Sequence, residues 1–318
     1  MKAVILSGGE GTRLRAISGG LPKPMMPLLG TPLLEHTIAL LRDNGFDRLC
    51  LTLHYQKEVI RDHFRDGHDY GVHIEYRDET QPLGTAGAVL NCEDFIAGET
   101  VLVMRGDSAC DFELSQLVKS HTQGVTIALA AQAEPLPYGL VITDRQGQVT
   151  GFLEKPSWER VVTDQVSTGI YVLSPDILSL IPRGRPYDFA KDLFPRLLEQ
   201  GIPLHGKVMD GYWCDIGTPH AYYQCNLDAL NGLYHLPGSV EAPRRILPCR
   251  DRARLTRAMS EALAEFGADF SDGLTISGAH GKAHLAPIAD QCALSLEGDR
   301  AAVRRLEALV RRLDKDLS

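Results

Sequence analysis

Short apolar runs that alternate with helix-like segments constrain the fold of this chain more than any other feature of its sequence. Val4–Leu6 is such a run, bounded by glycine and typical of a buried parallel strand. Thr31-Pro32 has the form of a helix N-cap with proline at the first helical position, and Gly45 ends that predicted helix. Strands alternating with helices predict an α/β fold with a largely parallel sheet. The other elements predicted here are strands over 49–53, 72–76 and 100–104 and a helix around 59–64.

The middle of the chain is richer in predicted strands. Leu140–Thr143 and Val149–Leu153 flank a polar turn, and this pattern indicates a hairpin. The other elements predicted here are a strand over 169–173, an amphipathic helix over 189–198, and a helix that begins at Thr218-Pro219 and ends near Gly232.

The character of the sequence changes after Gly232, where a segment with proline and glycine follows. We therefore expect a first domain over 1–232, a linker over 233–243 and a small α+β module over 244–318. The module is predicted to contain helices over 250–266 and 300–313 and short strands over 274–276, 284–285 and 293–296.

Charge and cysteine content exclude several classes of protein. The formal net charge of −8 argues against non-specific nucleic-acid binding. The seven cysteines are odd in number and form no C-x-x-C pair, so we expect reduced thiols in a cytoplasmic chain, without a zinc cluster or disulfide framework. No signal-peptide pattern opens the chain, and no apolar run reaches the ~18 residues of a membrane helix.

A glycine-rich loop follows the first predicted strand at Gly8–Leu14, and Leu21–Pro24 comes soon after it. Glycines at such a place let backbone N–H groups wrap a phosphate chain. Arg13 and Lys23 would add positive charge against a triphosphate. The alternative interpretation is a flexible turn with two surface cations.

Two other phosphate-binding loops do not match. A dinucleotide-binding fingerprint needs a third glycine where Leu14 stands, and it needs an acidic residue after the second strand, which ends near His54. A Walker loop needs Gly-Lys-Ser/Thr, whereas the chain has Gly11-Thr12-Arg13. An NAD-dependent dehydrogenase is therefore disfavoured.

Two aspartates stand where a metal could be held. Asp107 follows the apolar strand at Val101–Met104, at the edge where open α/β sheets bind ligands. Asp215 lies among apolar neighbours just before a predicted helix, and a carboxylate there is costly to bury unless it is paired. Nucleotide-bound Mg²⁺ is commonly held by one or two carboxylates plus phosphate oxygens. The alternatives are a turn aspartate at 107 and a helix-capping aspartate at 215.

Two further segments carry polar groups suited to substrate binding. Glu154-Lys155 ends the predicted hairpin and could hold a sugar hydroxyl and a phosphate, or could be two exposed surface charges. Gln81–Gly87 is a tight turn leading into a helix, whose backbone could lie against a base or could simply connect two elements.

Taken in chain order, these segments closely resemble the sugar-1-phosphate nucleotidylyltransferases, especially the mannose-1-phosphate guanylyltransferase branch. The resemblance covers 1–232 and implies a Rossmann-like mixed, largely parallel sheet with helices on both faces and a smaller sugar-binding β region. The segments that carry it are Gly-Gly-x-Gly-Thr-Arg-Leu at 8–14, Pro-Lys-Pro at 22–24, Pro-Leu-Gly-Thr-Ala-Gly at 82–87, Gly-Asp at 106–107, Glu-Lys-Pro at 154–156, Thr-Gly-Ile-Tyr at 168–171 and Trp-x-Asp-Ile-Gly-Thr at 213–218.

The resemblance implies a role for particular residues. Arg13, Lys23, Asp107 and Asp215 are expected to be catalytic, the two aspartates as Mg²⁺ ligands. The nucleotide-binding set that it implies is Leu6, Gly8, Gly9, Gly11, Thr12, Arg13, Lys23, Gln81, Gly84 and Thr85. The sugar-phosphate-binding set is Tyr138, Gly139, Glu154, Lys155 and Ser167.

Three places depart from the patterns of related proteins. Arg105 stands where the family commonly has Asn, and Ser167 stands where it typically has an Asn that contacts the sugar. The C-terminal module, through Ser271–Ile276, the predicted strand Lys282–Pro287 and the last predicted helix, resembles the last domain of phosphohexomutases. Ala286–Asp290 stands in place of the phosphate-binding loop and brings no cation. We therefore expect a non-catalytic remnant that serves packing or association with a second copy of the chain.

The expected reaction joins a nucleoside triphosphate, with GTP favoured, to a sugar 1-phosphate, with mannose 1-phosphate favoured. The ionised sugar phosphate attacks in line and pyrophosphate leaves, so alignment and charge neutralisation should supply the catalysis. The alternatives are a regulatory homologue that binds nucleotide sugars with little or no turnover, and a transferase that uses UTP or dTTP with another sugar.

Overall fold

The fold is described from a computed structural model of the 318-residue chain. The structure describes residues 1–14, 18, 20–230, 232–237, 244–248, 269–271, 275–278, 281–288 and 291–298. It divides into two compact units, one of Met1–Met26 with Leu33–Asp215 and one of Pro27–Pro32 with Ile216–Ser318. The linker expected over 233–243 lies partly outside the described residues, so the domain boundaries drawn from the sequence stay a prediction.

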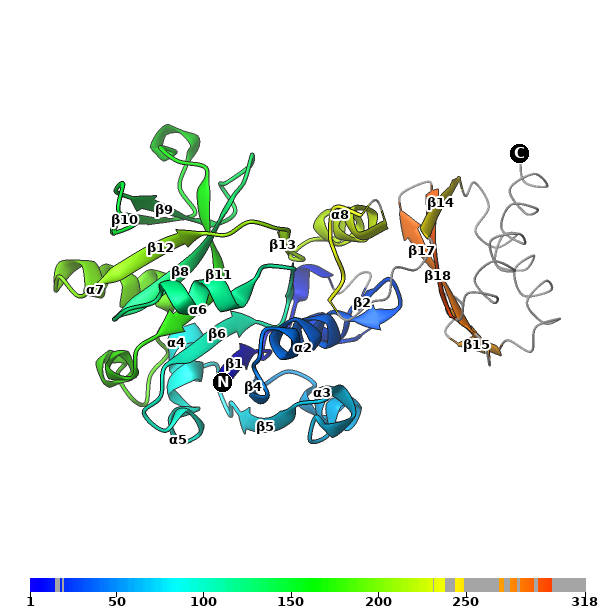
Figure 1. Cartoon of the computed structure of the whole chain (residues 1–318), viewed down its shortest axis with the longest axis horizontal. Coiled ribbons are helices and arrows are strands. Elements are labelled where there is room, and N and C mark those ends of the chain that lie inside the picture. Colours follow the sequence, from blue (N-terminus) through cyan, green and yellow to red (C-terminus); the bar gives the residue numbers. More distant parts are fainter. Residues whose placement is uncertain are drawn as a thin grey trace. The chain divides into compact units, whose positions relative to one another are not determined.

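A mixed sheet forms the centre of the first unit (Figure 1). Four strands at one end are parallel, in the order β5 (His73–Asp78), β4 (Arg48–Leu53), β1 (Lys2–Leu6) and β6 (Val101–Arg105). Ala3, Val4 and Ile5 on β1 are fully buried, as expected for a central parallel strand covered on both faces. This part of the sheet confirms the predicted parallel α/β core.

The other end of the sheet runs against this direction. β11 (Gln165–Leu173) is antiparallel both to β6 and to β8 (Val125–Ala131), and β12 (Leu204–Val208) is parallel to β8. The predicted hairpin is present as β9 (Gly139–Thr143) and β10 (Val149–Glu154). The sheet is therefore mixed, and its strands β8 and β12 were not predicted from the sequence.

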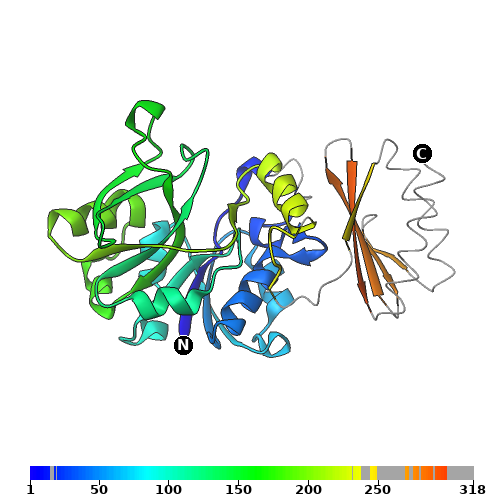
Figure 2. The ribbon, with the colours of Figure 1, turned by 45° about the horizontal axis from the view of Figure 1, so that its top comes forward.

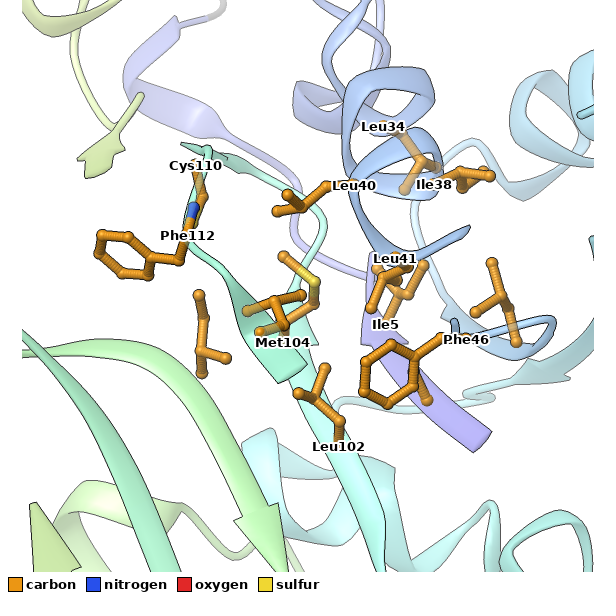
Figure 3. Packing of buried hydrophobic residues seen from close by; sticks show 14 of the residues in the cluster. Ile5, Leu34, Ile38, Leu40, Leu41, Phe46, Leu102, Met104, Cys110 and Phe112 are labelled. Atoms are coloured by element: carbon orange, nitrogen blue, oxygen red, sulfur yellow. The ribbon is translucent and has the colours of Figure 1, made fainter. Parts of the chain in front are cut away.

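Helices pack on both faces of the sheet, as predicted. Ala3 and Ile5 join one apolar cluster with Leu34 and Ile38 of α2 (Leu33–Asp43), whereas Val4 joins a second cluster on the opposite face. Figure 3 shows the first cluster, with Ile5, Leu34, Ile38, Met104 and Phe46 in one packed layer. α3 (Lys57–Phe64) and α6 (Leu114–Ser120) also pack on this face, while α4 (Gly84–Leu90), α5 (Glu93–Ile96) and α7 (Phe194–Glu199) pack on the other.

The segment before α2 corrects one expectation. Thr31-Pro32 does not cap the helix but forms the two-residue strand β3, which pairs with β2 (Pro27–Leu28), and α2 begins at Leu33. The second N-cap prediction holds, because Thr218 Oγ1 accepts a hydrogen bond of 3.1 Å from the Ala221 N–H at the start of α8 (Pro219–Leu230). The same Thr-Pro pattern thus has two outcomes, decided by whether a neighbouring strand is available for pairing.

The second unit also contains a five-stranded antiparallel sheet (Figure 2). The strands are β14 (Arg244–Pro248), β15 (Asp269–Ser271), β16 (Thr275–Gly278), β17 (Gly281–Ile288) and β18 (Gln291–Gly298), in the order β14-β18-β17-β16-β15. The three predicted strands correspond to β16, β17 and β18, whereas β14 and β15 were not predicted. Ala286–Ile288 ends strand β17, and the predicted helices 250–266 and 300–313 lie outside the described residues.

Among the described residues, no helix combines the length and the apolar character needed to cross a membrane.

Candidate active site

The carboxyl ends of two central parallel strands place the first site residues. Leu6 ends β1 and lies in register with Arg105, which ends β6. Asp107 sits in the turn between β6 and β7 (Ser108–Cys110). β13 (Trp213–Asp215) pairs antiparallel with β7 and puts Asp215 directly opposite Ser108. Residues far apart in the sequence therefore meet at one edge of the sheet.

Lys23 bridges the two predicted metal ligands. Its Nζ donates a hydrogen bond of 2.7 Å to Asp107 Oδ2 and one of 2.8 Å to Asp215 Oδ1. The three side chains are 6%, 14% and 16% exposed, respectively, so this is an ion-pair cluster largely shielded from water. Lys23 stands in the short 3-10 helix Lys23–Met25, which begins after Pro22. The structure thus brings together three of the four predicted catalytic residues.

Arg105 adds a second cation to Asp107. Its Nε donates to Asp107 Oδ1 and its Nη2 donates to Asp107 Oδ2, both at 2.8 Å. Burial alone would raise the pKa of Asp107, but the charges and hydrogen bonds of Arg105 and Lys23 outweigh it and hold that pKa well below its usual range. The Asp107 charge in turn raises the pKa of Arg105. Asp107 is therefore ionised at neutral pH.

The glycine loop lies against this cluster. Gly11 has a φ of +62°, and a Cβ there would stand 2.9 Å from Lys23 Cβ, so only glycine fits without strain. Gly8 approaches Glu79, whereas Gly9 has open space around it. Thr12 and Arg13 are exposed in the 3-10 helix Thr12–Leu14, which buried Leu14 anchors. Among the described residues Arg13 forms no ion pair, which leaves its guanidinium available to an anion.

Residues 187–189 support the predicted base-side turn through close packing and hydrogen bonds. Gly84 has a φ of +71°, and a Cβ there would stand 2.7 Å from the Tyr187 carbonyl oxygen. Thr85 Oγ1 donates to Asp188 Oδ1 and accepts from the Phe189 N–H, both at 3.0 Å. The Thr85 hydroxyl thus serves the turn itself, while Gln81 is exposed. Contact of these residues with a base stays a prediction.

Glu79 lies at this site but was not among the residues predicted from the sequence. It follows β5, and its Oε2 accepts a hydrogen bond of 3.1 Å from the Leu83 N–H. Burial raises the pKa of Glu79, because the ionised carboxylate loses hydration there. Since a Cβ on Gly8 would lie 3.1 Å from Glu79 Oε1, this side chain fills the space between the glycine loop and the base-side turn. No local pattern marks it, because its contact with Gly8 joins segments that are about seventy positions apart in the sequence.

The predicted sugar side is built on the β9–β10 hairpin. Gly139 pairs with Glu154, and a Cβ on Gly139 would stand 3.0 Å from Glu154 Oε2. Lys155 has a φ of +46°, uncommon for a residue with a side chain, and its N–H donates to the Tyr138 carbonyl at 3.1 Å. The Glu154 and Lys155 side chains are exposed and form no ion pair among the described residues.

Aromatic side chains support this sugar side. Tyr138 packs edge-on against Trp213, with ring centroids 5.1 Å apart, and the Trp213 indole N–H donates to the Thr168 carbonyl at 3.1 Å. Ser167 Oγ lies 3.4 Å from the Tyr171 hydroxyl. Burial raises the pKa of Tyr138 to about 12, with the Asp215 charge adding to the effect. The rings therefore connect the sugar side to the strand that carries Asp215.

The donor set at 107 and 215 fits a hard divalent cation. Both carboxylates converge on one ammonium nitrogen, and Asp215 Oδ2 accepts no hydrogen bond from the described residues. Ser108 Oγ is buried without a partner among the described residues, and its side chain projects from the same face as the opposed Asp215. Because no group of three or more His, Cys, Asp or Glu gathers within the described residues, phosphate oxygens and water would complete a metal's coordination.

Comparison with known proteins agrees with this geometry. A family model described as nucleotidyl transferase matches residues 2–232. The chain belongs to the nucleotidyl transferase family. The resemblance to the sugar-1-phosphate nucleotidylyltransferases is therefore confirmed at the level of the family.

Relatives within the family carry different substrate names. The chain is 37% identical to the UTP–glucose-1-phosphate uridylyltransferase of Synechocystis sp., over 70% of this chain and 62% of that protein. It is 36% identical to the mannose-1-phosphate guanylyltransferase of Mycobacterium tuberculosis, over 74% of this chain and 66% of that protein. The chain thus spans just under two thirds of the length of these curated relatives.

A solved structure has a similar fold. The crystal structure of HddC from Yersinia pseudotuberculosis matches with a TM-score of 0.63 and 28% identity, covering 72% of this chain and 99% of that one. The same protein has also been solved in complex with GMP-PN.

Proposed function

We propose that this chain joins a nucleoside triphosphate to a sugar 1-phosphate and releases pyrophosphate. The observation that carries the proposal is the convergence of Lys23, Asp107 and Asp215 at the carboxyl edge of the sheet, next to the glycine loop. Open α/β sheets bind ligands at this edge. Family membership over 2–232 supports the reaction class.

Charge neutralisation and alignment account for the chemistry. The sugar phosphate is already ionised, so its oxygen attacks the α-phosphorus without a general base. Arg13 and Lys23 would offset the charge on the leaving pyrophosphate, and Lys155 would orient the attacking phosphate. Mg²⁺ held by Asp107 and Asp215 would supply Lewis-acid neutralisation of the phosphate oxygens.

GTP and mannose 1-phosphate are the substrate pair that we propose. The ordered motifs match the guanylyltransferase branch, and the Mycobacterium tuberculosis relative carries that name. The Synechocystis relative carries a uridylyltransferase name at nearly the same identity, so UTP with glucose 1-phosphate is the main competing pair. Ser167 belongs to the predicted sugar-phosphate-binding set and stands where the family typically has Asn.

A matrix of nucleoside triphosphates against sugar 1-phosphates tests the proposal. Pyrophosphate release is measured with GTP, UTP, dTTP and ATP, each paired with mannose 1-phosphate and glucose 1-phosphate, in the presence of Mg²⁺. We expect the highest kcat/KM for GTP with mannose 1-phosphate. A higher kcat/KM for UTP or dTTP with glucose 1-phosphate contradicts the substrate pair, and no release with any pair, while nucleotide sugars still bind, favours the regulatory homologue.

The C-terminal module is proposed to have no catalytic role. The family match ends at residue 232, and all predicted catalytic residues lie before Ile216. We propose that the module serves packing or association with a second copy of the chain.

A further inference from the structure

We propose that Arg105 is a positioning residue that closes the carboxylate pair to free divalent cations, so that the metal enters only together with the nucleotide. The inference rests on the proposed function for one point, the assignment of Asp107 and Asp215 to the metal. It concerns the order of binding and the residue that imposes it.

The contacts of Asp107 show that its oxygens are already engaged. Oδ1 accepts from Arg105 Nε, and Oδ2 accepts from both Arg105 Nη2 and Lys23 Nζ. All three distances are 2.7–2.8 Å, as expected for charge-assisted hydrogen bonds. Three of the roughly four lone-pair sites of this carboxylate are therefore occupied, and a cation that binds both oxygens of Asp107 must displace at least one of these donors.

The charges around the pair are balanced before any metal arrives. Two carboxylates, Asp107 and Asp215, face two cations, Lys23 and Arg105. A divalent cation added to this cluster meets two positive charges within a few ångströms, and such repulsion is strong where water is largely excluded. Without Arg105 one positive charge would remain, and the carboxylate pair would carry a net negative charge that favours a metal.

Arg105 is the donor that can leave. Its side chain is 42% exposed, whereas that of Lys23 is 6% exposed and held by both carboxylates. The bulge at Gly169 in β11 makes room for its stem, because a Cβ there would stand 2.7 Å from Arg105 Cδ. Arg105 can therefore move toward solvent without rearrangement of the packed core.

A nucleotide would give the displaced guanidinium a new partner. Phosphate oxygens, like carboxylate oxygens, accept paired hydrogen bonds from an arginine guanidinium. Binding of the metal–nucleotide complex thus exchanges an Arg105–Asp107 contact for an Arg105–phosphate contact. A free metal ion offers no such exchange, and its binding leaves Arg105 without an acceptor.

The test measures Mn²⁺ binding to the free protein by electron paramagnetic resonance, with no turnover involved. We expect Arg105→Asn to bind Mn²⁺ more tightly than the unmodified chain, on the order of tenfold to a hundredfold, because one nearby positive charge is removed. Arg105→Lys, which keeps the charge but loses the two-point contact, should lie close to the unmodified chain. Arg145→Asn, at an exposed position in the β9–β10 turn, removes the same charge and should change nothing.

Two further measurements fix the site and the order of binding. Adding Asp107→Asn to Arg105→Asn should abolish the gain in Mn²⁺ affinity. With a non-hydrolysable GTP analogue bound, the difference in Mn²⁺ affinity between Arg105→Asn and the unmodified chain should fall to a few-fold or less. Phosphate oxygens then supply some of the metal's ligands. Thermal unfolding confirms that each variant is folded, and Arg105→Met serves as a second neutral variant should Arg105→Asn fail to fold.

The proposal is overturned if folded Arg105→Asn and Arg105→Met bind Mn²⁺ no more tightly than the unmodified chain, or if the gain survives Asp107→Asn. These outcomes do not depend on catalysis. A chain that transfers no nucleotide but shows the predicted Mn²⁺ pattern would contradict the proposed function and leave this inference standing. Nucleotidyl transfer by the unmodified chain, with no effect of the Arg105 substitutions on Mn²⁺ affinity, would support the proposed function and contradict this inference.

Discussion

The two sides of the candidate site are built in opposite ways. On the predicted nucleotide side, Lys23, Asp107 and Asp215 are largely shielded from water and joined by hydrogen bonds of 2.7–2.8 Å. On the predicted sugar side, the Glu154 and Lys155 side chains are exposed and form no ion pair among the described residues. The first group of side chains is therefore held by its own contacts, whereas the polar groups of the second are exposed to solvent.

This difference predicts which substitutions should affect the rate of the chemical step and which should affect substrate affinity. Groups that are already fixed around developing charge contribute most to the transition state, because they need no reorganisation during the reaction. Exposed groups that become ordered on binding contribute to affinity, less the entropy of ordering them. Substitutions on the nucleotide side should therefore reduce kcat most strongly, and those on the sugar side should act mainly through KM.

The largest effect is expected from the two aspartates. Asp107→Asn and Asp215→Asn should each lower kcat by on the order of a thousandfold at saturating Mg²⁺, because each loses a metal ligand. Steady-state pyrophosphate release measures the loss, with circular dichroism as a check on folding. Asp164→Asn, at an exposed position, is the matched control. Near-normal turnover by either folded variant would exclude that aspartate as an essential ligand.

A smaller effect is expected from Lys155→Met. Loss of a charge-assisted hydrogen bond to the sugar phosphate should cost about 1.5–3 kcal/mol, or roughly ten- to a hundredfold in kcat/KM for the sugar 1-phosphate. The KM for the nucleoside triphosphate should stay within about twofold, since Lys155 lies on the other side of the site. Lys119→Met, exposed on α6, removes the same charge. An equal rise in both KM values would contradict the separation of the two sides.

Thr85→Val tests whether the nucleotide side is braced by 187–189. The substitution keeps the side-chain shape but leaves the Asp188 carboxylate and the Phe189 N–H without their shared partner. The free energy of unfolding should fall by about 1–3 kcal/mol, and the KM for the nucleotide should rise while that for the sugar phosphate does not. Urea unfolding and paired KM measurements decide the matter, with exposed Thr122→Val as control. An unchanged stability would mean that the brace contributes nothing.

The smallest effect is expected from Glu79→Gln and depends on pH. Because the folded-state pKa of Glu79 is raised, the ionised carboxylate lowers stability as pH rises through that pKa. The change in Tm caused by Glu79→Gln should therefore be more positive at pH 7 than at pH 4, where Glu79 is already largely protonated. Glu58→Gln, exposed on α3, should show no such pH dependence. A difference of the opposite sign would show that the charge is stabilised by its surroundings.

Much of the first unit could be predicted because its signals are local. The apolar run at Val4–Leu6, the glycine loop after it and the turn of the β9–β10 hairpin are each encoded within a few residues. β8 was missed although Val125–Ala131 is an apolar run directly after Gly124, whereas β12 carries no clear strand pattern and depends on pairing with β8. Thr31-Pro32 was assigned to a helix N-cap because this dipeptide is common there, but it pairs instead with Pro27–Leu28 across the turn Leu29-Gly30.

The sequence by itself determined which groups this protein can use: the glycine loop, its two cations, the two aspartates, and the Glu-Lys pair that ends a hairpin. Only the tertiary structure decided how they are paired. Lys23 reaches Asp107 across 84 positions and Asp215 across 192, through the order of β1, β6, β7 and β13. Arg105 faces Asp107 because a turn at Gly106 and the bulge at Gly169 leave room for its side chain. Short segments of the sequence give the types of side chain, whereas strand order and register set the distances between the charged groups of the site.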